Sequence, residues 1–548
     1  MSDTNTKRYD YKTSWEKYTY NREDNRFLSC DEEDLLKICD CIDLNSNSPK
    51  KTSGGIPIRY HDGKIYVLKE GPHTRVEGES GCKKSRTVGR GSAITAILNR
   101  DSFIMTDPKG EICSDKKIKW LLEKAGVQTY ILDFRNFDKD GYNPLSYAFE
   151  LMKRGKKNQA MAAIDKFVNM LKESHEGADD PYWNGQAGDI IRFAEQILAI
   201  ALSQIEGGEK VFNLSSVKSF IRQDREQLQR IFAYLANKEK MCNALMGYND
   251  IIQLGAEKTY SCIVSSANAL LSDFASSDEL LKMLSIQTFD IRTFYSRPSA
   301  LFLVVPDEHK TYNMLAGYLV DQFYQILVET YSEKYQGKQE PICEIKFICD
   351  EAANIKINDL ASKVSASRSR KMDWTLIFQS ERQMAEAYRK DWPTICGNCK
   401  HRIYLGSSDY EILKNISVQA GVTYLSRDGN AVPLVSVADL RRMRKEKEFK
   451  DALILTGNHI YCAELPDYET FEFLKTATTE WPKKILETDT GVYTPEDIYY
   501  DYKVSRISFS ETEKVDRNTR EKKQVKEKDN SLKMGLDDLF EGLFGEED

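Results

Sequence analysis

The stretch GESGCKKSRT, residues 78–87, carries the residue types of a phosphate-binding loop. Gly78, Lys84 and Ser85 meet the pattern G-x-x-x-x-G-K-[ST], but Lys83 stands where the second glycine belongs. In such a loop the backbone N–H groups and a helix N-terminus bind phosphates, the lysine reaches the outer phosphates, and the hydroxyl binds magnesium. The stretch therefore predicts a nucleotide site with one irregular position.

A second stretch, FICDEAAN, supplies the carboxylates that ATP chemistry requires. Its β-rich run ends in Asp350 and Glu351, so Asp350 would join the magnesium shell and Glu351 would position the attacking water. Each stretch alone is weak, because a basic loop can be a solvated turn and an acidic pair after a strand is common. Together, loop first and carboxylates later, they favour a nucleotide site.

Composition limits the class of protein. A chain of 548 residues exceeds one ordinary hydrophobic core, so two or three domains are expected. The net charge of -7 neither supports nor excludes DNA binding, and any basic surface must be local, as at 153–157 or 441–447. Twelve cysteines without disulfide-like spacing, and no N-terminal leader pattern, predict a cytoplasmic protein. The apolar stretch from Ile190 contains Arg192 and Glu195, which favours a buried helix over a membrane span.

The order of predicted elements indicates an α/β fold with a mostly parallel sheet, interrupted by an all-α domain. Six segments are expected: a polar N-terminal segment 1–55, a first α/β part 56–147, an all-α insertion 148–290, a second α/β part 291–504, a charged linker 505–530 and an acidic amphipathic tail 531–548. The tail has apolar residues at helical spacing, which is typical of a helix that docks on a partner; the alternative is a frayed acidic end.

Two groups of cysteines imitate metal sites. Cys396 and Cys399 lie close to His401, and Cys30, Cys39 and Cys41 form a second cluster; neither group has further ligands at the spacing that zinc sites use. We therefore expect structural cysteines at 396 and 399, with a zinc site in the N-terminal cluster as the minor alternative.

Further blocks turn the motif into a resemblance. In order along about residues 65–475, the chain contains SFIMTDPKGEI, YILDF, GYNPLSY, FICDEAANI, SASRSRKMDWTLIFQSERQM and ICGNCKHRIYLGSSD. This series resembles the coupling proteins of type IV secretion systems, the TraG/TraD-like conjugative DNA pumps. The resemblance implies a RecA-like motor domain with an all-α domain inserted in it.

The resemblance also implies a function. It implies a ring of six subunits that hydrolyses ATP with Mg²⁺ and hands relaxase-bound DNA to a type IV secretion channel. Gln379 matches the glutamine that senses the γ-phosphate, and Arg368 or Arg370 matches an arginine finger acting across a subunit boundary, with a solvated helix face as the alternative for either arginine. The implied nucleotide-binding residues are Gly78, Glu79, Ser80, Gly81, Cys82, Lys83, Lys84, Ser85 and Arg86, with Ser85 and Asp350 as magnesium ligands.

Two departures from the family pattern matter. We find no membrane-spanning helix of the kind that begins typical coupling proteins, so the protein is expected either to be soluble or to be recruited by a partner to the inner face of the cytoplasmic membrane. The other departure is Lys83, which would carry a conformational cost on the order of 1 kcal/mol or more if the loop needs a positive φ there. Its charge would either attract phosphate or block closure of the loop, which leaves a catalytically weak pseudo-ATPase serving as an accessory subunit as the alternative function.

Overall fold

The computed structural model describes residues 20–21, 26–27, 39–45, 52, 54–68, 73–175, 181–238, 242–253, 257–306, 308–338, 342–424, 431–443, 445–456, 459–475, 490–504 and 506–509. The chain divides into two compact units, Met1–Asp140 with Phe289–Ile485 and Gly141–Thr288 with Leu486–Asp548. Cys30 and most of the expected linker and tail, residues 510–548, lie outside the described residues.

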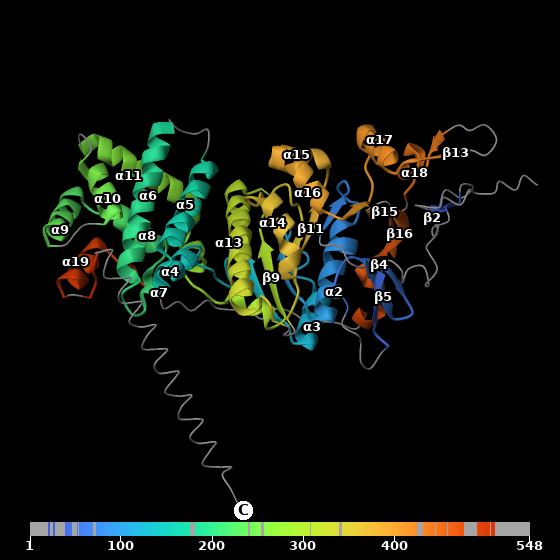
Figure 1. The fold of residues 1–548 in the computed structure, drawn as a ribbon, viewed down its shortest axis with the longest axis horizontal. Helices are drawn as coiled ribbons and strands as arrows, with labels where there is room; N and C mark the ends of the chain where they lie inside the picture. The colour runs from blue at the N-terminus through green and yellow to red at the C-terminus, as the bar shows by residue number, and fades with distance from the viewer. Residues whose placement is uncertain are drawn as a thin grey trace, which may run out of the picture. The chain divides into compact units, whose positions relative to one another are not determined.

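A nine-stranded sheet forms the centre of the first unit, in the order β16-β15-β12-β6-β11-β10-β7-β9-β8. Of its strands, Figure 1 labels β9, β11, β15 and β16. The strands from β12 to β8 pair in parallel, and β15 and β16 add an antiparallel edge. The strands are β6 (His73–Glu77), β7 (Ser102–Thr106), β8 (Gln128–Asp133), β9 (Ser299–Val304), β10 (Ile345–Cys349), β11 (Met372–Phe378), β12 (His401–Tyr404), β15 (Phe449–Thr456) and β16 (His459–Pro466).

The central strands are apolar because both faces of a parallel sheet are covered by helices. All residues of β7, β9 and β10 are buried. The helices of this unit are α2 (Arg90–Asn99), α3 (Lys116–Ala125), α13 (Lys310–Lys334), α14 (Leu360–Ser367), α15 (Glu381–Tyr388), α16 (Trp392–Asn398), α17 (Tyr410–Gln419) and α18 (Val437–Arg441), with the π-helix η1 (Lys84–Gly89) leading directly into α2.

The register of the strands places three of the candidate segments at the same ends of neighbouring strands. Glu77 of β6 pairs with Phe378 of β11, and Leu376 of β11 pairs with Cys349 of β10. The carboxyl ends of these three strands therefore meet at one edge, with β11 between the other two. The phosphate loop, the acidic pair and Gln379 each directly follow one of these strands.

A small antiparallel sheet of β3 (Cys39–Asp43), β5 (Lys64–Leu68) and β4 (Pro57–His61) also belongs to the first unit. We expected the fold to begin near Ile56, but β3 precedes it and pairs with β5. Cys39 and Ile42 of β3 are buried in the core of the unit. Short strands with alternating Asp and Cys give little hydrophobic signal, which is why the sequence suggested an irregular segment.

The second unit is helical. Its helices are α4 (Ser146–Lys153), α5 (Lys157–Ser174), α6 (Pro181–Leu202), α7 (Gly208–Val211), α8 (Leu214–Ile221), α9 (Arg225–Lys238), α10 (Asn243–Gln253), α11 (Glu257–Ser272), α12 (Asp278–Met283) and α19 (Pro495–Lys503). The central helix α6 contacts α5, α8, α10 and α11, so the apolar stretch from Ile190 forms a protein core. No helix among the described residues is long and apolar enough to cross a bilayer.

The predicted fold class is therefore confirmed: a mostly parallel α/β sheet domain is interrupted by an all-α unit. One assignment differs from our expectation for 291–504. Residues 490–504, with α19, group with the helical unit, because α19 contacts α9 and the Asn213 side chain donates to the carbonyl of Gly491 at 3.0 Å.

Candidate nucleotide site

The phosphate loop connects the end of β6 to the π-helix η1. Gly81 has a φ of 83° and Lys83 a φ of 60°, so both residues occupy the left-handed region. Backbone hydrogen bonds fix the base of the loop, from Gly78 N to the Phe378 carbonyl at 3.3 Å and from Glu79 N to the Gly406 carbonyl at 3.0 Å. The loop thus has the positive φ that explains why glycine is favoured at the position of Lys83.

The side chains of Lys84 and Ser85 are held by the loop itself and by the acidic pair. The buried Lys84 ammonium donates to the carbonyls of Gly78 at 2.7 Å and Glu79 at 3.3 Å, so it lies inside the loop. Ser85 Oγ donates to Asp350 Oδ2 at 2.7 Å. The fold therefore brings the side-chain oxygens of two residues that are far apart in the sequence into direct contact.

The two residues of the acidic pair, which follow β10, lie in different environments. Asp350 is buried, its carbonyl accepts from Thr106 Oγ1 at 2.8 Å, and burial raises the pKa of its carboxyl to about 6. Glu351 is only partly buried and has a φ of 51°. Gln379 Nε2 donates to Glu351 Oε1 at 3.2 Å, so the glutamine after β11 orients the second carboxylate.

Lys83 does not point toward the space for phosphate. Its ammonium lies 3.0 Å from Asp467 Oδ2 and donates to the carbonyls of Glu446 at 2.5 Å and Lys447 at 2.8 Å. A carboxylate and two carbonyls already bind the ammonium, so this conformation does not favour the first of the two expected effects of Lys83, the attraction of phosphate.

Arg86 shares the same partner. Its Nε and Nη2 donate to the two oxygens of Asp467 at 2.7 and 2.8 Å, and Nη2 also lies 2.9 Å from Glu469 Oε2. Burial alone would raise the pKa of Asp467, but the hydrogen bonds from Arg86 and Lys83 hold that pKa below its ordinary value. Sequence reasoning missed Asp467, because it lies in a segment without a motif, directly after strand β16, and its only signal was an aspartate at the end of a buried strand.

The oxygen donors at this edge suit Mg²⁺. Magnesium is usually held by one or two protein oxygens together with phosphates and water, and Ser85 Oγ and Asp350 Oδ2 are such donors. Within the described ranges, no group of three or more His, Cys, Asp or Glu side chains could hold a metal ion. Cys396 Sγ instead accepts from Arg75 Nη1 at 2.5 Å, and Cys399 is buried.

The structure does not bring the two candidate arginine fingers to the loop of their own chain. Arg368 and Arg370 lie in a short turn just before β11, whereas Gln379 follows its other end. Seven strand residues separate the two ends, a span of about 20 Å at roughly 3.3 Å per residue. Arg370 Nη1 donates to the carbonyl of Ala366 at 2.6 Å.

Comparison with known proteins gives a family and a set of similar folds. Residues 38–441 match the family described as type IV secretory system conjugative DNA transfer. The plasmid coupling protein TrwB in complex with the non-hydrolysable ATP analogue ADPNP is 16% identical, over 82% of this chain and 98% of that one, with a TM-score of 0.52. The trigonal form of TrwBdeltaN70 with sulphate is 17% identical over 76% and 88%, with a TM-score of 0.51. At such identities the likeness shows the fold alone. No curated protein sequence matches the chain.

Proposed function

Because the chain belongs to the type IV secretory system conjugative DNA transfer family, we propose that it is an ATP-dependent, DNA-translocating coupling protein. It delivers relaxase-bound DNA to a type IV secretion channel. Its cofactors are ATP and Mg²⁺, and TrwB, which shares the fold, has been solved with an ATP analogue.

The hydrogen bond between Ser85 Oγ and Asp350 Oδ2 supports this proposal most directly. It joins the phosphate loop to the acidic pair across strands β6, β11 and β10, and Gln379 directly follows β11, the strand between the other two. Three segments that each carry one part of ATP chemistry thus share one sheet edge, which is where open parallel sheets bind ligands.

Each residue then has a defined role. The loop N–H groups and η1 bind the phosphates, and the Lys84 ammonium exchanges the carbonyls of Gly78 and Glu79 for phosphate oxygens. Ser85 and Asp350 hold Mg²⁺, which neutralises charge on the transferring phosphoryl group when bound. Glu351 orients the attacking water and accepts its proton, and Gln379 holds the Glu351 carboxylate in place.

The partners follow from the same proposal. Six subunits form a ring in which Arg368 or Arg370 of one subunit approaches the nucleotide of the next, since neither reaches the loop of its own chain. DNA is contacted through its phosphates by lysines and arginines, without base readout. The relaxase and channel components are the protein partners.

DNA-stimulated ATP hydrolysis by the purified chain tests the proposal. Lys84→Ala and Glu351→Gln should each abolish turnover, while Lys414→Ala, an exposed lysine on α17, should leave it unchanged. Sedimentation with ATP and DNA should show a ring. A wild type that hydrolyses no ATP, or stays monomeric under all conditions, argues against a motor.

A second candidate function rests on Lys83, which lies in the left-handed region and is bound to Asp467. A loop held this way could bind nucleotide without turnover, as in a pseudo-ATPase that recognises substrates for the transfer machinery. Binding of ATP without hydrolysis, together with turnover restored by Lys83→Gly, would establish this alternative.

A further inference from the structure

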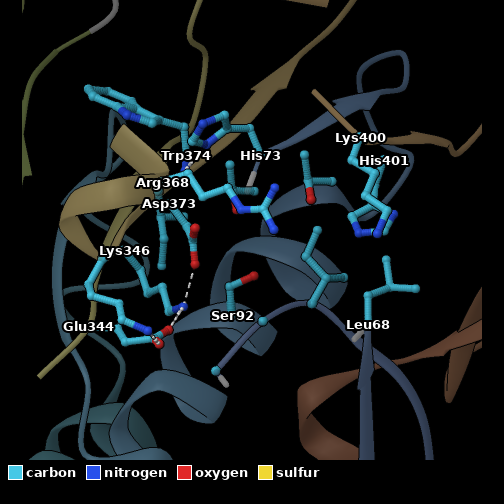
Figure 2. A pocket seen from close by; sticks show the side chains of 17 residues that line it. Leu68, His73, Ser92, Glu344, Lys346, Arg368, Asp373, Trp374, Lys400 and His401 are labelled. Carbon is cyan, nitrogen blue, oxygen red and sulfur yellow. Dashed lines mark hydrogen bonds and ion pairs between the residues drawn. The ribbon is translucent and has the colours of Figure 1, made fainter. Parts of the chain in front are cut away.

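A cavity of about 310 Å³ lies at the opposite edge of the sheet, where the parallel strands begin (Figure 2). His73, Ile348, Trp374 and His401 contribute to its lining from β6, β10, β11 and β12. Because the strands are parallel, the start of β6 at His73 is separated from the phosphate loop by the length of this five-residue strand, about 15 Å at roughly 3.3 Å per residue. The cavity is therefore distinct from the candidate nucleotide site.

Positively charged side chains outnumber negatively charged ones in the lining of this cavity. Lys346 Nζ is neutralised on the wall by Glu344 Oε2 at 2.8 Å and Asp373 Oδ2 at 2.6 Å. Arg368, Lys371 and Lys400 also line the cavity and are exposed, and Lys371 Nζ lies 3.9 Å from Glu344 Oε1. Figure 2 shows the guanidinium group of Arg368 extended over the hollow. The lining thus carries an excess of positive charge.

Two buried polar side chains face the cavity without partners. His401 is 3% exposed and Ser92 4% exposed, and within the described part of the chain neither ring nitrogen of His401 nor Ser92 Oγ has a hydrogen-bond partner. Figure 2 shows the His401 ring and the Ser92 hydroxyl at the same hollow. Buried groups of this kind ordinarily find a partner, because leaving them unpaired costs about 1–3 kcal/mol each.

His73 shows what a structural histidine does in the same cavity. Its Nε2 bonds the Val364 carbonyl at 2.6 Å, and its Nδ1 accepts from Trp374 N at 3.1 Å. His401 has neither contact. Burial and the neighbouring Lys400 lower the pKa of His401 to about 4, so at neutral pH its ring offers one donor and one acceptor.

We propose that this cavity binds a phosphate-type oxyanion through Ser92, His401 and Lys400. The hydroxyl and the imidazole N–H donate to oxyanion oxygens, the imidazole acceptor receives a phosphate or water hydrogen, and the exposed cations supply the attraction. An apolar ligand would leave the two buried polar groups unpaired, and a cation would meet the positive rim. The oxyanion is either free phosphate or a phosphodiester of nucleic acid.

The test removes the competing site first. In a Lys84→Ala background, which disables the phosphate loop, inorganic phosphate is titrated into the full chain by calorimetry. One phosphate site is expected to persist. Lys400→Glu and Ser92→Ala should each weaken it by about tenfold, as expected for loss of a charge-assisted or buried phosphate contact. Lys414→Glu, the same charge change on exposed α17, should not weaken it.

The absence of phosphate binding in the Lys84→Ala protein overturns the proposal, as does an equal effect of Lys400→Glu and Lys414→Glu. Lys400 is exposed, so Lys400→Glu keeps the test valid if Ser92→Ala fails to fold. If a short single-stranded oligonucleotide displaces the bound phosphate, the site is assigned to nucleic acid. If the oligonucleotide does not displace it, the site is assigned to free phosphate. Nucleotide binding by the wild-type protein is measured in parallel. A failure of the proposed nucleotide site can therefore be distinguished from a failure of the phosphate cavity.

Discussion

Lys83 and Asp467 form an ion pair of 3.0 Å, in which the lysine at the irregular position of the phosphate loop is bound by a carboxylate with no exposed surface. Arg86 binds the same carboxylate through two nitrogens. Asp467 N in turn donates to the Glu448 carbonyl at 2.7 Å, so the aspartate is itself fixed. The lysine that stands in place of glycine thus forms an ion pair that ties the phosphate loop to Asp467, a residue outside the loop.

This pair predicts different stabilities for two variants of Lys83. Lys83→Met retains the left-handed backbone and loses the ion pair, so it should lower the free energy of unfolding by about 1–2 kcal/mol. Lys83→Gly loses the same pair but relieves about 1 kcal/mol of backbone strain, so it should be less destabilised. Urea unfolding, with Lys414→Met as the control, measures both. Equal destabilisation by the two variants would contradict a strained loop.

Asp350 predicts a pH dependence of stability in the absence of nucleotide. Its pKa is raised from 3.8 to about 6, so the folded state binds the proton more tightly than the unfolded state. This contribution to stability is fully present below pH 3.8 and is lost as the pH rises through about 6, for a total of about 3 kcal/mol at about 1.4 kcal/mol per unit.

Asp350→Asn keeps an acceptor for Ser85 and removes the titration. The variant should therefore be more stable than the wild type at pH 8, and this advantage should shrink toward pH 4. It should also lose Mg²⁺-dependent nucleotide affinity. Thermal unfolding from pH 4 to 8 provides the comparison, and parallel curves for the two proteins would refute the prediction.

Gln379 should affect turnover more than binding. It holds Glu351 through a hydrogen bond of 3.2 Å, so Gln379→Ala should lower kcat by about 10- to 100-fold, as expected for a displaced catalytic group. The nucleotide Kd should change less than twofold, because the loop is untouched. Steady-state hydrolysis and equilibrium nucleotide binding separate the effects; a parallel loss in both would assign Gln379 to binding.

Arg368 and Arg370 should differ as arginine fingers. Arg370 is tied to the Ala366 carbonyl of its own helix turn, whereas the Arg368 side chain makes no ion pair with a described residue. We expect Arg368→Ala to lower kcat by about 10³-fold and Arg370→Ala by less. Mixing the Arg368→Ala and Glu351→Gln proteins should restore part of the activity if the finger acts in trans. No recovery in mixed assemblies would place the residue within its own subunit.

Glu195 predicts a stabilising substitution in the helical unit. It lies in α6 with no exposed surface, neither carboxyl oxygen has a hydrogen-bond partner among the described residues, and burial raises its pKa well above the ordinary value. The contribution of Glu195 to the stability of the folded state is therefore greatest at low pH and is lost as the pH rises. Glu195→Gln should raise Tm at pH 8 and have little effect near pH 4. An equal shift at both pH values would mean that the change acts through packing.

Local patterns in the sequence were sufficient to propose the phosphate loop and the acidic pair as parts of a nucleotide site, because each carries a short motif, whereas Gln379 was proposed from the family resemblance. The parallel sheet and the all-α interruption were predictable as well, since hydrophobic periodicity is a local property. The strand β3 was not, because five residues with alternating polar side chains give little signal without their partner β5.

Only the tertiary structure decided how these parts meet. The sheet order places β11 between β6 and β10, which brings Ser85 to Asp350 and Gln379 to Glu351; no spacing in the chain encodes that order. The ion pair of Lys83 with Asp467, and the cavity containing His401 and Ser92, join residues separated by hundreds of positions. Such contacts depend on strand pairing and packing across the whole unit, so a local pattern could identify Lys83 as irregular but could not reveal its partner.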